Sequence, residues 1–285
     1  KLPEYLPDNW KGPFLLLVFT FILSSFLDNI AGAMIGGTIA MVVFNKKVHL
    51  GYLVAIVAAS NAGGSGSVLG DTTTTMMWID GVSPLNVLHA YIAAVTAFLV
   101  FAFFSSKQQD KYHPIMKHAK KGVKFKIDKL FTVILILVGA IITNIFFDLP
   151  MLGVWIAIIV SSGFTSIPWK ESKNAFKGTI FLLCLVSCAS LMPVNELPPA
   201  SVMNTFILGF VSSVFDNIPL TKLCLDQGCY DWGMLAYAVG FGGSITWFGS
   251  SAGVAICNEF PEAKNVWLWI KNGWHVILAY IIGFI

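Results

Sequence analysis

The stretch Ser24-Ser25-Phe26-Leu27-Asp28-Asn29-Ile30 lies in otherwise apolar sequence and returns as Ser212-Ser213-Val214-Phe215-Asp216-Asn217-Ile218. Equivalent positions are 188 residues apart in both comparisons (212 minus 24, and 216 minus 28). A carboxylate inside a bilayer costs several kcal/mol, so an acidic residue at that depth is a functional candidate by default. Two acids in matching contexts predict one site built from two repeated halves.

Composition places the chain among polytopic membrane proteins. Of its 285 residues, 56% are hydrophobic and only 12% are charged, and the mean hydropathy is +0.76. Soluble globular domains carry about 25% charged residues. The sequence therefore excludes the class of soluble globular domains.

Apolar runs of spanning length give the predicted uninterrupted transmembrane helices. These lie at 84–105, 130–147, 151–167, 178–194 and 265–285. Two further long segments, 48–79 and 231–258, each contain a glycine-rich break near the middle. The breaks also repeat, because Gly63 and Gly242 are 179 residues apart (242 minus 63), and Gly70 and Gly249 are equally spaced (249 minus 70).

The segments around the two Asp-Asn pairs are shorter than a membrane span. In the first, the apolar arms 14–25 and 33–44 have 12 residues each. Each arm would reach only about 18 Å, against a hydrocarbon core of about 30 Å. This pattern predicts a re-entrant helical hairpin over 13–45, with its tip near the membrane midplane. A second, less regular hairpin is predicted over 200–225.

The predicted elements form an all-α membrane protein made of two repeats. The first repeat covers 1–106, a basic loop follows at 107–129, and the second repeat covers 130–285. The second repeat has three predicted helices before its hairpin, whereas the first repeat has none. We therefore expect the chain to lack upstream helices, which a companion N-terminal segment would supply.

Lysine placement gives an expected orientation. All 18 basic residues are lysines, and threading the predicted elements puts every one except Lys222 on the same face. The positive-inside rule makes that face cytoplasmic, so membrane topology accounts for the basic loop without a nucleic-acid partner. The first hairpin would then open to the cytoplasm and the second to the outside, which is the inverted-repeat pattern of secondary transporters. We expect a multi-pass protein of the cell inner membrane, surrounded by membrane lipid.

Three motifs resemble those of the NhaD-type sodium/proton antiporters of the ion transporter superfamily. They are the tip Phe26-Leu27-Asp28-Asn29, the break Asn61-Ala62-Gly63-Gly64, and the run 70–79. The resemblance covers nearly the whole chain, and residues 61–79 are its most specific part. It implies an inverted-repeat bundle with a scaffold domain and a mobile transport domain, often dimeric, that moves like an elevator. A homodimer is therefore expected, with a role in antiport and pH homeostasis.

Oxygen-bearing side chains at the predicted midplane suit a hard alkali cation. Burial favours the protonated form of a carboxyl group and a bound cation displaces the proton, so Na⁺ (or Li⁺) and H⁺ would compete for the same acids. The expected Na⁺ ligands are Asp28, Asp71 and Asp216. The wider cation and proton site comprises Asp28, Asn29, Asn61, Asp71, Thr73, Thr74, Ser212, Asp216 and Asn217, with Ser25, Ser244 and Ser250 as weaker members. No enzymatic activity and no cofactor are expected.

Simpler structural roles stay open for several of these residues. Asp28 and Asp71 precede predicted helical stretches and would also serve as N-caps. The threonines at 72–75 would also bond the backbone of a membrane helix, and the glycine breaks would also allow close helix packing. Because Asp71 corresponds to Ser250 across the repeat, the first half is expected to bind the cation more strongly.

Two other functions bear on the same residues. An intramembrane aspartyl protease also uses two buried acids, but its Gly-x-Gly-Asp motif needs glycine where this chain has Val68. An anion transporter of the same superfamily, for a dicarboxylate, citrate or arsenite, is the stronger alternative. The chain has no arginine to bind such an anion bidentately, and three buried acids would repel it. Sodium/proton antiport is therefore the favoured function.

Overall fold

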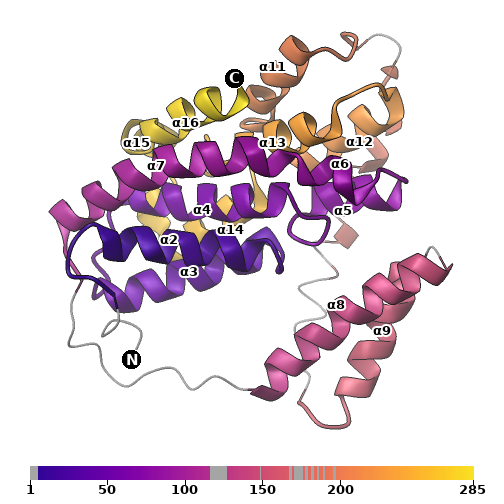
Figure 1. Ribbon diagram of the computed structural model, residues 1–285, viewed down its shortest axis with the longest axis horizontal. Helices are drawn as coiled ribbons and strands as arrows, with labels where there is room; N and C mark the ends of the chain where they lie inside the picture. Colours follow the sequence, from indigo (N-terminus) through magenta and orange to yellow (C-terminus); the bar gives the residue numbers. More distant parts are fainter. Residues whose placement is uncertain are drawn as a thin grey trace. The chain divides into compact units, whose positions relative to one another are not determined.

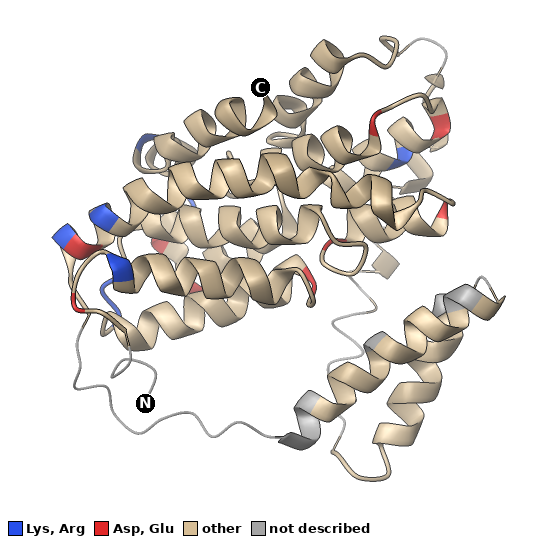
Figure 2. Ribbon diagram, in the orientation of Figure 1, with Lys and Arg blue, Asp and Glu red and all other residues tan. Residues whose placement is uncertain are grey.

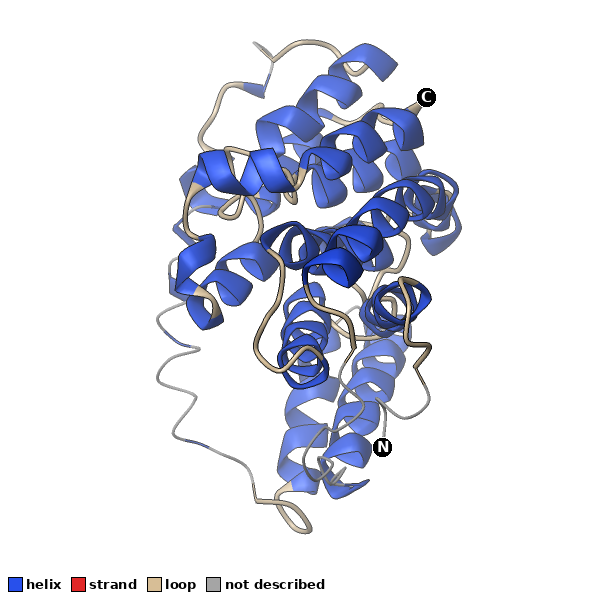
Figure 3. Ribbon diagram, turned by 90° about the vertical axis from the view of Figure 1, so that its left-hand side faces the viewer, coloured by secondary structure: helices blue, strands red, loops and turns tan. Residues whose placement is uncertain are grey.

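The chain is helical throughout the part that a computed structural model describes, and Figure 3 shows only helices and loops there. This part comprises residues 6–115, 127–147, 149–166, 169, 176, 179–180, 183–184, 186–188, 190–194 and 197–285. The chain divides into two compact units. The larger unit is Lys1–Lys121 with Val186–Ile285, and the smaller is Gly122–Leu185.

The first half of the larger unit contains a helical hairpin and an interrupted helix (Figure 1). Helices α2 (Lys11–Ser24) and α3 (Asn29–Val43) form the hairpin. The interrupted helix consists of α4 (Leu50–Ser65) and α5 (Thr72–Ile79). The interruptions fall at the Asp-Asn tip and at the glycine-rich break of the sequence.

The second half of the larger unit has the same order of elements. Helices α11 (Val202–Ser212) and α12 (Asn217–Gln227) flank the second Asp-Asn tip. Helices α13 (Trp232–Gly242) and α14 (Ser251–Glu259) flank the second glycine-rich break. Figure 1 shows α3 ending on the left of the unit and α12 ending on the right, so the two hairpins open toward opposite ends.

The two helices predicted at 84–105 and 265–285 are both divided. The first consists of α6 (Pro84–Leu88) and α7 (Ala90–Tyr112). The second consists of α15 (Val266–Asn272) and α16 (Trp274–Phe284), which follow a short 3₁₀ turn, η3 (Pro261–Ala263). The prediction of an uninterrupted helix at 265–285 is therefore wrong.

Local chemistry explains the division at Gly273 and also why α7 runs past residue 105, where its predicted helix ends. The Asn272 side chain donates to the Leu268 carbonyl oxygen at 2.8 Å, and Gly273 ends α15, a residue pair typical of helix termini. In α7, Lys107 and Gln108 are good helix formers, so this helix continues past residue 105. Within the described residues, Pro84–Tyr112 is the helical stretch that is long and apolar enough to cross a membrane alone.

The smaller unit is a pair of packed helices, α8 (Ile127–Phe147) and α9 (Pro150–Ser161). A Cβ added to Gly139 would lie 2.8 Å from the Gly153 carbonyl oxygen, so the two backbones approach closely. The Gly153 amide also donates to the Thr143 hydroxyl at 3.1 Å. Of the helix predicted at 178–194, residues 179–180, 183–184, 186–188 and 190 are helical, and 178, 181–182, 185 and 189 lie outside the described residues.

The core of the larger unit is built on α4 and α13. Every residue of α4 from Gly51 to Ser65 is buried, and so is α13 from Leu235 to Gly242. The two helices also pack against each other. A helix that is apolar on all sides belongs in the interior, so these two interrupted helices hold their breaks inside the protein.

The remaining helices pack around this pair in a repeated pattern. Helix α2 packs on α4, as α11 packs on α13. The returning arms cross to the opposite half, because α3 packs on α14 and α12 packs on α5. Each hairpin therefore contacts both interrupted helices, and each break is enclosed by elements from both halves of the sequence.

Two hydrogen bonds at equivalent positions of the two halves show the same repeated packing. The Ser24 hydroxyl donates to the Ser60 carbonyl oxygen at 2.7 Å, and the Ser212 hydroxyl donates to the Val239 carbonyl oxygen at 2.7 Å. The donors are 188 residues apart (212 minus 24) and the acceptors 179 (239 minus 60). These are the two offsets of the sequence repeat, so the two halves pack alike.

The lysines of the larger unit are unevenly distributed. Figure 2 shows basic segments where α2 begins, where α7 ends and at α15, all at one end of the unit. A basic segment in α12 lies at the opposite end. There, Lys222 forms an ion pair with Asp226.

Because the chain packs closely at the glycine breaks, we predict that an added methyl group lowers the stability of the fold more at these glycines than at other buried ones. A Cβ on Gly63 would collide with the Phe21 carbonyl oxygen, and one on Gly242 with the Gly209 carbonyl oxygen. Backbone atoms cannot move aside, so Gly63→Ala and Gly242→Ala should each destabilise the fold by about 1–3 kcal/mol.

Thermal denaturation of the purified protein, followed by size-exclusion chromatography, measures this loss. Gly37→Ala is the matched control, because its added Cβ would meet the terminal methyl group of the Ile256 side chain at 2.6 Å and no backbone atom. Equal melting temperatures for all three variants would contradict the packing described here.

Candidate functional site

Four chain breaks meet inside the larger unit. A Cβ on Gly70, in the first glycine-rich break, would lie 2.5 Å from the Ser24 carbonyl oxygen at the first hairpin tip. A Cβ on Gly249, in the second break, would lie 2.7 Å from the Ser213 carbonyl oxygen at the second tip. Each hairpin tip is thus in contact with the break of its own half.

Asp71 is the most deeply buried acid of this region, with 2% of its surface exposed. Its Oδ1 accepts a hydrogen bond from the Thr73 amide at 3.1 Å, so it caps the N-terminus of α5. Its Oδ2 accepts from Asn29 Nδ2 at 3.1 Å. Among the described residues no lysine pairs with this carboxyl group. Its hydrogen bonds therefore come from neutral donors.

A chain of amide hydrogen bonds connects Asp71 to the second half of the sequence. Asn29 Nδ2 also donates to Asn61 Oδ1 at 3.1 Å. Asn61 Nδ2 in turn donates to the Ser244 hydroxyl at 2.9 Å and to the Ser250 hydroxyl at 3.0 Å. The site is therefore formed jointly by the first hairpin tip, the first break and the second break.

Gly240 of α13 faces the Asp71 carboxyl group. A Cβ at this position would lie 3.5 Å from Asp71 Oδ2. Across the sequence repeat, Gly240 is equivalent to Asn61 (240 minus 179). The second half thus has no side chain at the position where the first half has an amide, which leaves room beside the carboxylate.

Asp28 and Asp216 lie at the first and the second hairpin tip. Both are partly buried, and both cap helices, through hydrogen bonds from the Ile30 amide at 3.2 Å and the Ile218 amide at 2.9 Å. Both interact electrostatically with the Asp71 carboxyl group. Within the described residues, however, no three Asp, Glu, His or Cys side chains form a group that could hold a metal ion.

Several other predicted site residues use their hydroxyl groups to bond backbone carbonyl oxygens. The Thr74 hydroxyl donates to the Ser67 and Asp71 carbonyl oxygens, at 2.7 and 2.9 Å, and the Ser212 hydroxyl to a carbonyl of α13. The Ser25 hydroxyl donates to the Phe21 and Gly63 carbonyl oxygens, at 3.1 and 3.0 Å. These side chains satisfy the interrupted backbone.

One predicted residue keeps a polar atom available. The Thr73 hydroxyl is buried and forms no hydrogen bond of ordinary geometry among the described residues, although it is close enough to interact with the Asp71 carboxyl group. Asn217 is only 3% exposed. Thr73 lies next to the central acid on α5, so its hydroxyl is a candidate oxygen ligand there.

Sequence reasoning missed several residues that hold this region together. Ser60 donates its hydroxyl to the Asn29 carbonyl oxygen. Tyr91 of α7 donates to the Gly63 carbonyl oxygen at 3.1 Å, and Trp269 of α15 to the Ser244 carbonyl oxygen at 3.1 Å. Ser24 could have been found by subtracting the repeat offset of 188 from Ser212, whereas the two aromatic contacts depend on how α7 and α15 pack.

The chemistry of the site follows from this inventory. One fully buried carboxylate is surrounded by amide and hydroxyl groups, with a side-chain-free position at Gly240. Oxygen-rich surroundings of this kind suit hard cations. A single carboxylate at the centre balances the charge of one monovalent cation or one proton.

Several characterised proteins are similar to this chain over most of its length. It is 28% identical to sodium/proton antiporter 1 of Arabidopsis thaliana over 93% of the chain and 53% of that protein. It is 25% identical to sodium/proton antiporter 2 of the same plant, over 93% of the chain and 73% of that protein. For Na(+)/H(+) antiporter NhaD of Vibrio cholerae, the values are 23%, 93% and 67%.

These similarities agree with the motifs quoted from the sequence. No family model matches the chain, and the chain spans about half the length of the first of these relatives. The relatives carry the names of membrane transporters, not of enzymes. The chain is thus similar, over nearly its whole length, to proteins named sodium/proton antiporters, including NhaD from several bacteria.

Proposed function

We propose that this chain exchanges sodium, or lithium, for protons across a membrane. The buried Asp71 carboxylate, with its neutral amide and hydroxyl neighbours, is the observation that carries the proposal. The names of the relatives support the same reaction. The cation and the proton would occupy the same carboxylate in turn, because either one neutralises its charge.

The amides beside Asp71 have a role in this exchange. An amide group presents N–H donors on one side and a carbonyl acceptor on the other. With no cation bound, Asn29 donates to Asp71 Oδ2 and to Asn61 Oδ1. When a cation enters, rotation of the Asn29 side chain would replace these donors by an oxygen ligand without moving the backbone.

Asp28 and Asp216 contribute in a second way. Their electrostatic interaction with Asp71 raises the negative potential at the site, which attracts cations and repels anions. Because each acid sits at a different hairpin tip, each would guide ions from a different side. We propose that Asp71 is the primary ligand and that Asp28 and Asp216 assist from the two tips.

Alternating access would follow from the arrangement of the two halves. We propose that the hairpins are re-entrant, that the repeat is inverted, and that the lysine-rich end faces the cytoplasm. The opposite openings of the hairpins and the equivalent hydrogen bonds of Ser24 and Ser212 support this arrangement. A site between inverted repeats can be exposed to one side and then the other as one part of the protein moves.

Removal of the central carboxylate is the first test of this function. Asp71→Asn should reduce sodium-dependent proton movement to the level of vesicles that lack the protein, because an amide cannot exchange a proton for a cation. The measurement is sodium-induced dequenching of a pH-sensitive dye in membrane vesicles. Asp28→Asn and Asp216→Asn should retain partial activity with weaker sodium affinity.

The matched control is Asp80→Asn, which removes an exposed acid at the other end of α5. Equal amounts of each variant in the membrane, measured by immunoblotting, separate lost transport from lost folding. Full exchange by Asp71→Asn would refute the proposal. Citrate and arsenite serve as controls for the anion alternative, since movement driven by either would indicate that class instead.

Competition for one carboxylate also predicts how protons affect sodium affinity. A tenfold rise in proton concentration should raise the half-saturating sodium concentration by up to about tenfold, while the maximal rate is unchanged. The same vesicles, assayed at several pH values over a range of sodium concentrations, give both quantities. A falling maximal rate at constant sodium affinity would mean that protons act somewhere other than the sodium site.

The amide network can be tested separately from the acid. Asn29→Ala removes the side-chain oxygen that would bind the cation and should raise the half-saturating sodium concentration about tenfold, which corresponds to about 1.4 kcal/mol of lost binding free energy. Asn258→Ala, which removes an exposed amide of α14, is the control and should leave sodium affinity unchanged. Unaltered affinity in Asn29→Ala would exclude the amide from ion binding.

A further inference from the structure

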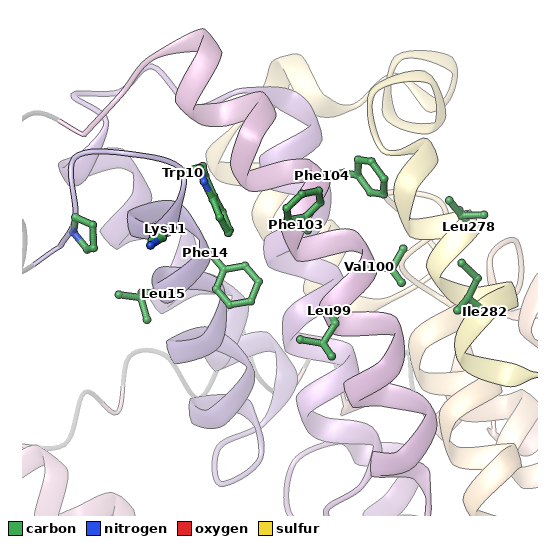
Figure 4. Close-up of a pocket in the computed structure, with 11 residues that line it drawn as sticks. Trp10, Lys11, Phe14, Leu15, Leu99, Val100, Phe103, Phe104, Leu278 and Ile282 are labelled. Carbon is green, nitrogen blue, oxygen red and sulfur yellow. The ribbon is translucent and has the colours of Figure 1, made fainter.

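An apolar groove of about 780 Å³ lies on the larger unit, and none of the polar-site residues lines it (Figure 4). Residues of α2, α7 and α16 line it, together with the segment that precedes α2. They are Pro7, Trp10, Lys11, Phe14, Leu15, Leu99, Val100, Phe103, Phe104, Leu278 and Ile282. Its volume is in the range of pockets that hold small organic ligands.

One end of the groove carries positive charge. Lys11 lines it directly, and the Lys107 amino group lies 4.1 Å from the ring centre of Phe103, another lining residue. Neither lysine forms an ion pair with any residue in the described part of the chain. Trp10 stands at the same end and packs edge-on against Phe103, with ring centres 5.4 Å apart.

The rest of the groove is apolar and open. Leu99 is 56% exposed and Ile282 is 42% exposed, and Figure 4 shows Leu99 in the middle of the groove and Leu278 and Ile282 at the far end from Lys11. The groove is thus polarised along its length, with cations and an indole at one end and aliphatic side chains at the other. This arrangement is complementary to an anionic amphiphile, whose headgroup would meet the lysines and whose hydrocarbon chain would cover the aliphatic side chains.

We propose that this groove binds an anionic phospholipid of the membrane leaflet on the lysine-rich side. The phosphate would lie between Lys11 and Lys107, and one acyl chain would extend past Leu99 toward Ile282. Basic pockets between membrane helices on the cytoplasmic side bind anionic headgroups in this manner, and Trp residues favour the interface where a headgroup meets a chain. The inference rests on the proposed membrane orientation, but not on which ion is transported.

The position of the groove gives the lipid a structural consequence. Helix α2 is the entering arm of the hairpin that carries Asp28, and α7 carries Tyr91, which bonds the backbone at the first break. A lipid in the groove would contact both helices at once. It would therefore stabilise the packing of the first hairpin on α7. Lipid binding can thus be measured through the stability of the protein, without a transport assay.

The test compares phosphatidylglycerol with phosphatidylcholine, each added to the purified protein in detergent. Native mass spectrometry measures lipid retention, and thermal denaturation measures stabilisation. Wild type should retain phosphatidylglycerol and melt at a higher temperature with it, and should respond weakly to phosphatidylcholine. The double variant Lys11→Gln/Lys107→Gln should bind phosphatidylglycerol roughly 30-fold more weakly, as expected when two lysine contacts at a bilayer surface are lost.

Two further variants separate a specific site from general attraction. Lys46→Gln removes a lysine that does not line the groove and should retain wild-type binding. Leu99→Trp places a bulky side chain in the groove and should weaken retention of the lipid, while the lysines remain. The proposal fails if both lipids bind alike, if Lys46→Gln weakens binding as much as the double variant, or if Leu99→Trp converts a dimer into a monomer without affecting lipid retention.

Discussion

A backbone that is interrupted inside an apolar core must find hydrogen-bond partners within the protein, because neither lipid nor core can supply them. Four interruptions meet in this chain, and side chains bond the exposed carbonyl groups around them. Ser24 and Ser212 do so for the two long interrupted helices, and Ser25 and Tyr91 both donate to Gly63. Much of the polarity of this region therefore maintains the fold, and the groups left over define the site.

In both halves, side chains bond the interrupted backbone, but the two halves differ in the polar groups that are left for the site. Asn61 and Asp71 of the first half correspond to Gly240 and Ser250 of the second. The first half thus supplies an amide and a charge, while the second supplies space and a hydroxyl. A symmetric pair of buried acids would place two like charges in contact, which disfavours ionisation of both. The asymmetry leaves one carboxylate at the centre, with the other acids at the hairpin tips.

The repeated motifs and glycine breaks made both hairpin tips and both breaks predictable, and Asn29, Asn61 and Asp71 with them. These positions carry polar groups where an apolar residue would be expected, so the sequence marks them directly. Thr74 was harder to interpret, because a hydroxyl that bonds its own backbone looks the same in sequence as one that binds an ion. Tyr91 could not be predicted, since its role arises only where α7 crosses the first break. The division at Gly273 was overlooked because the longer segments on either side are apolar, although Asn272 and Gly273 themselves are residues typical of a helix end.

A single central carboxylate also limits which ions the proposed exchange could use. Divalent cations usually need several charged oxygens, and within the described residues no group of three acidic, His or Cys side chains provides them. The Asp71 carboxylate carries one negative charge, which either a proton or a monovalent cation neutralises, and this buried charge is uncompensated when neither is bound. That charge makes the empty site unfavourable, so a mobile element would move most easily when loaded. In the proposed exchange, coupling between the two ions would then follow from electrostatics alone, without a separate pathway for the proton.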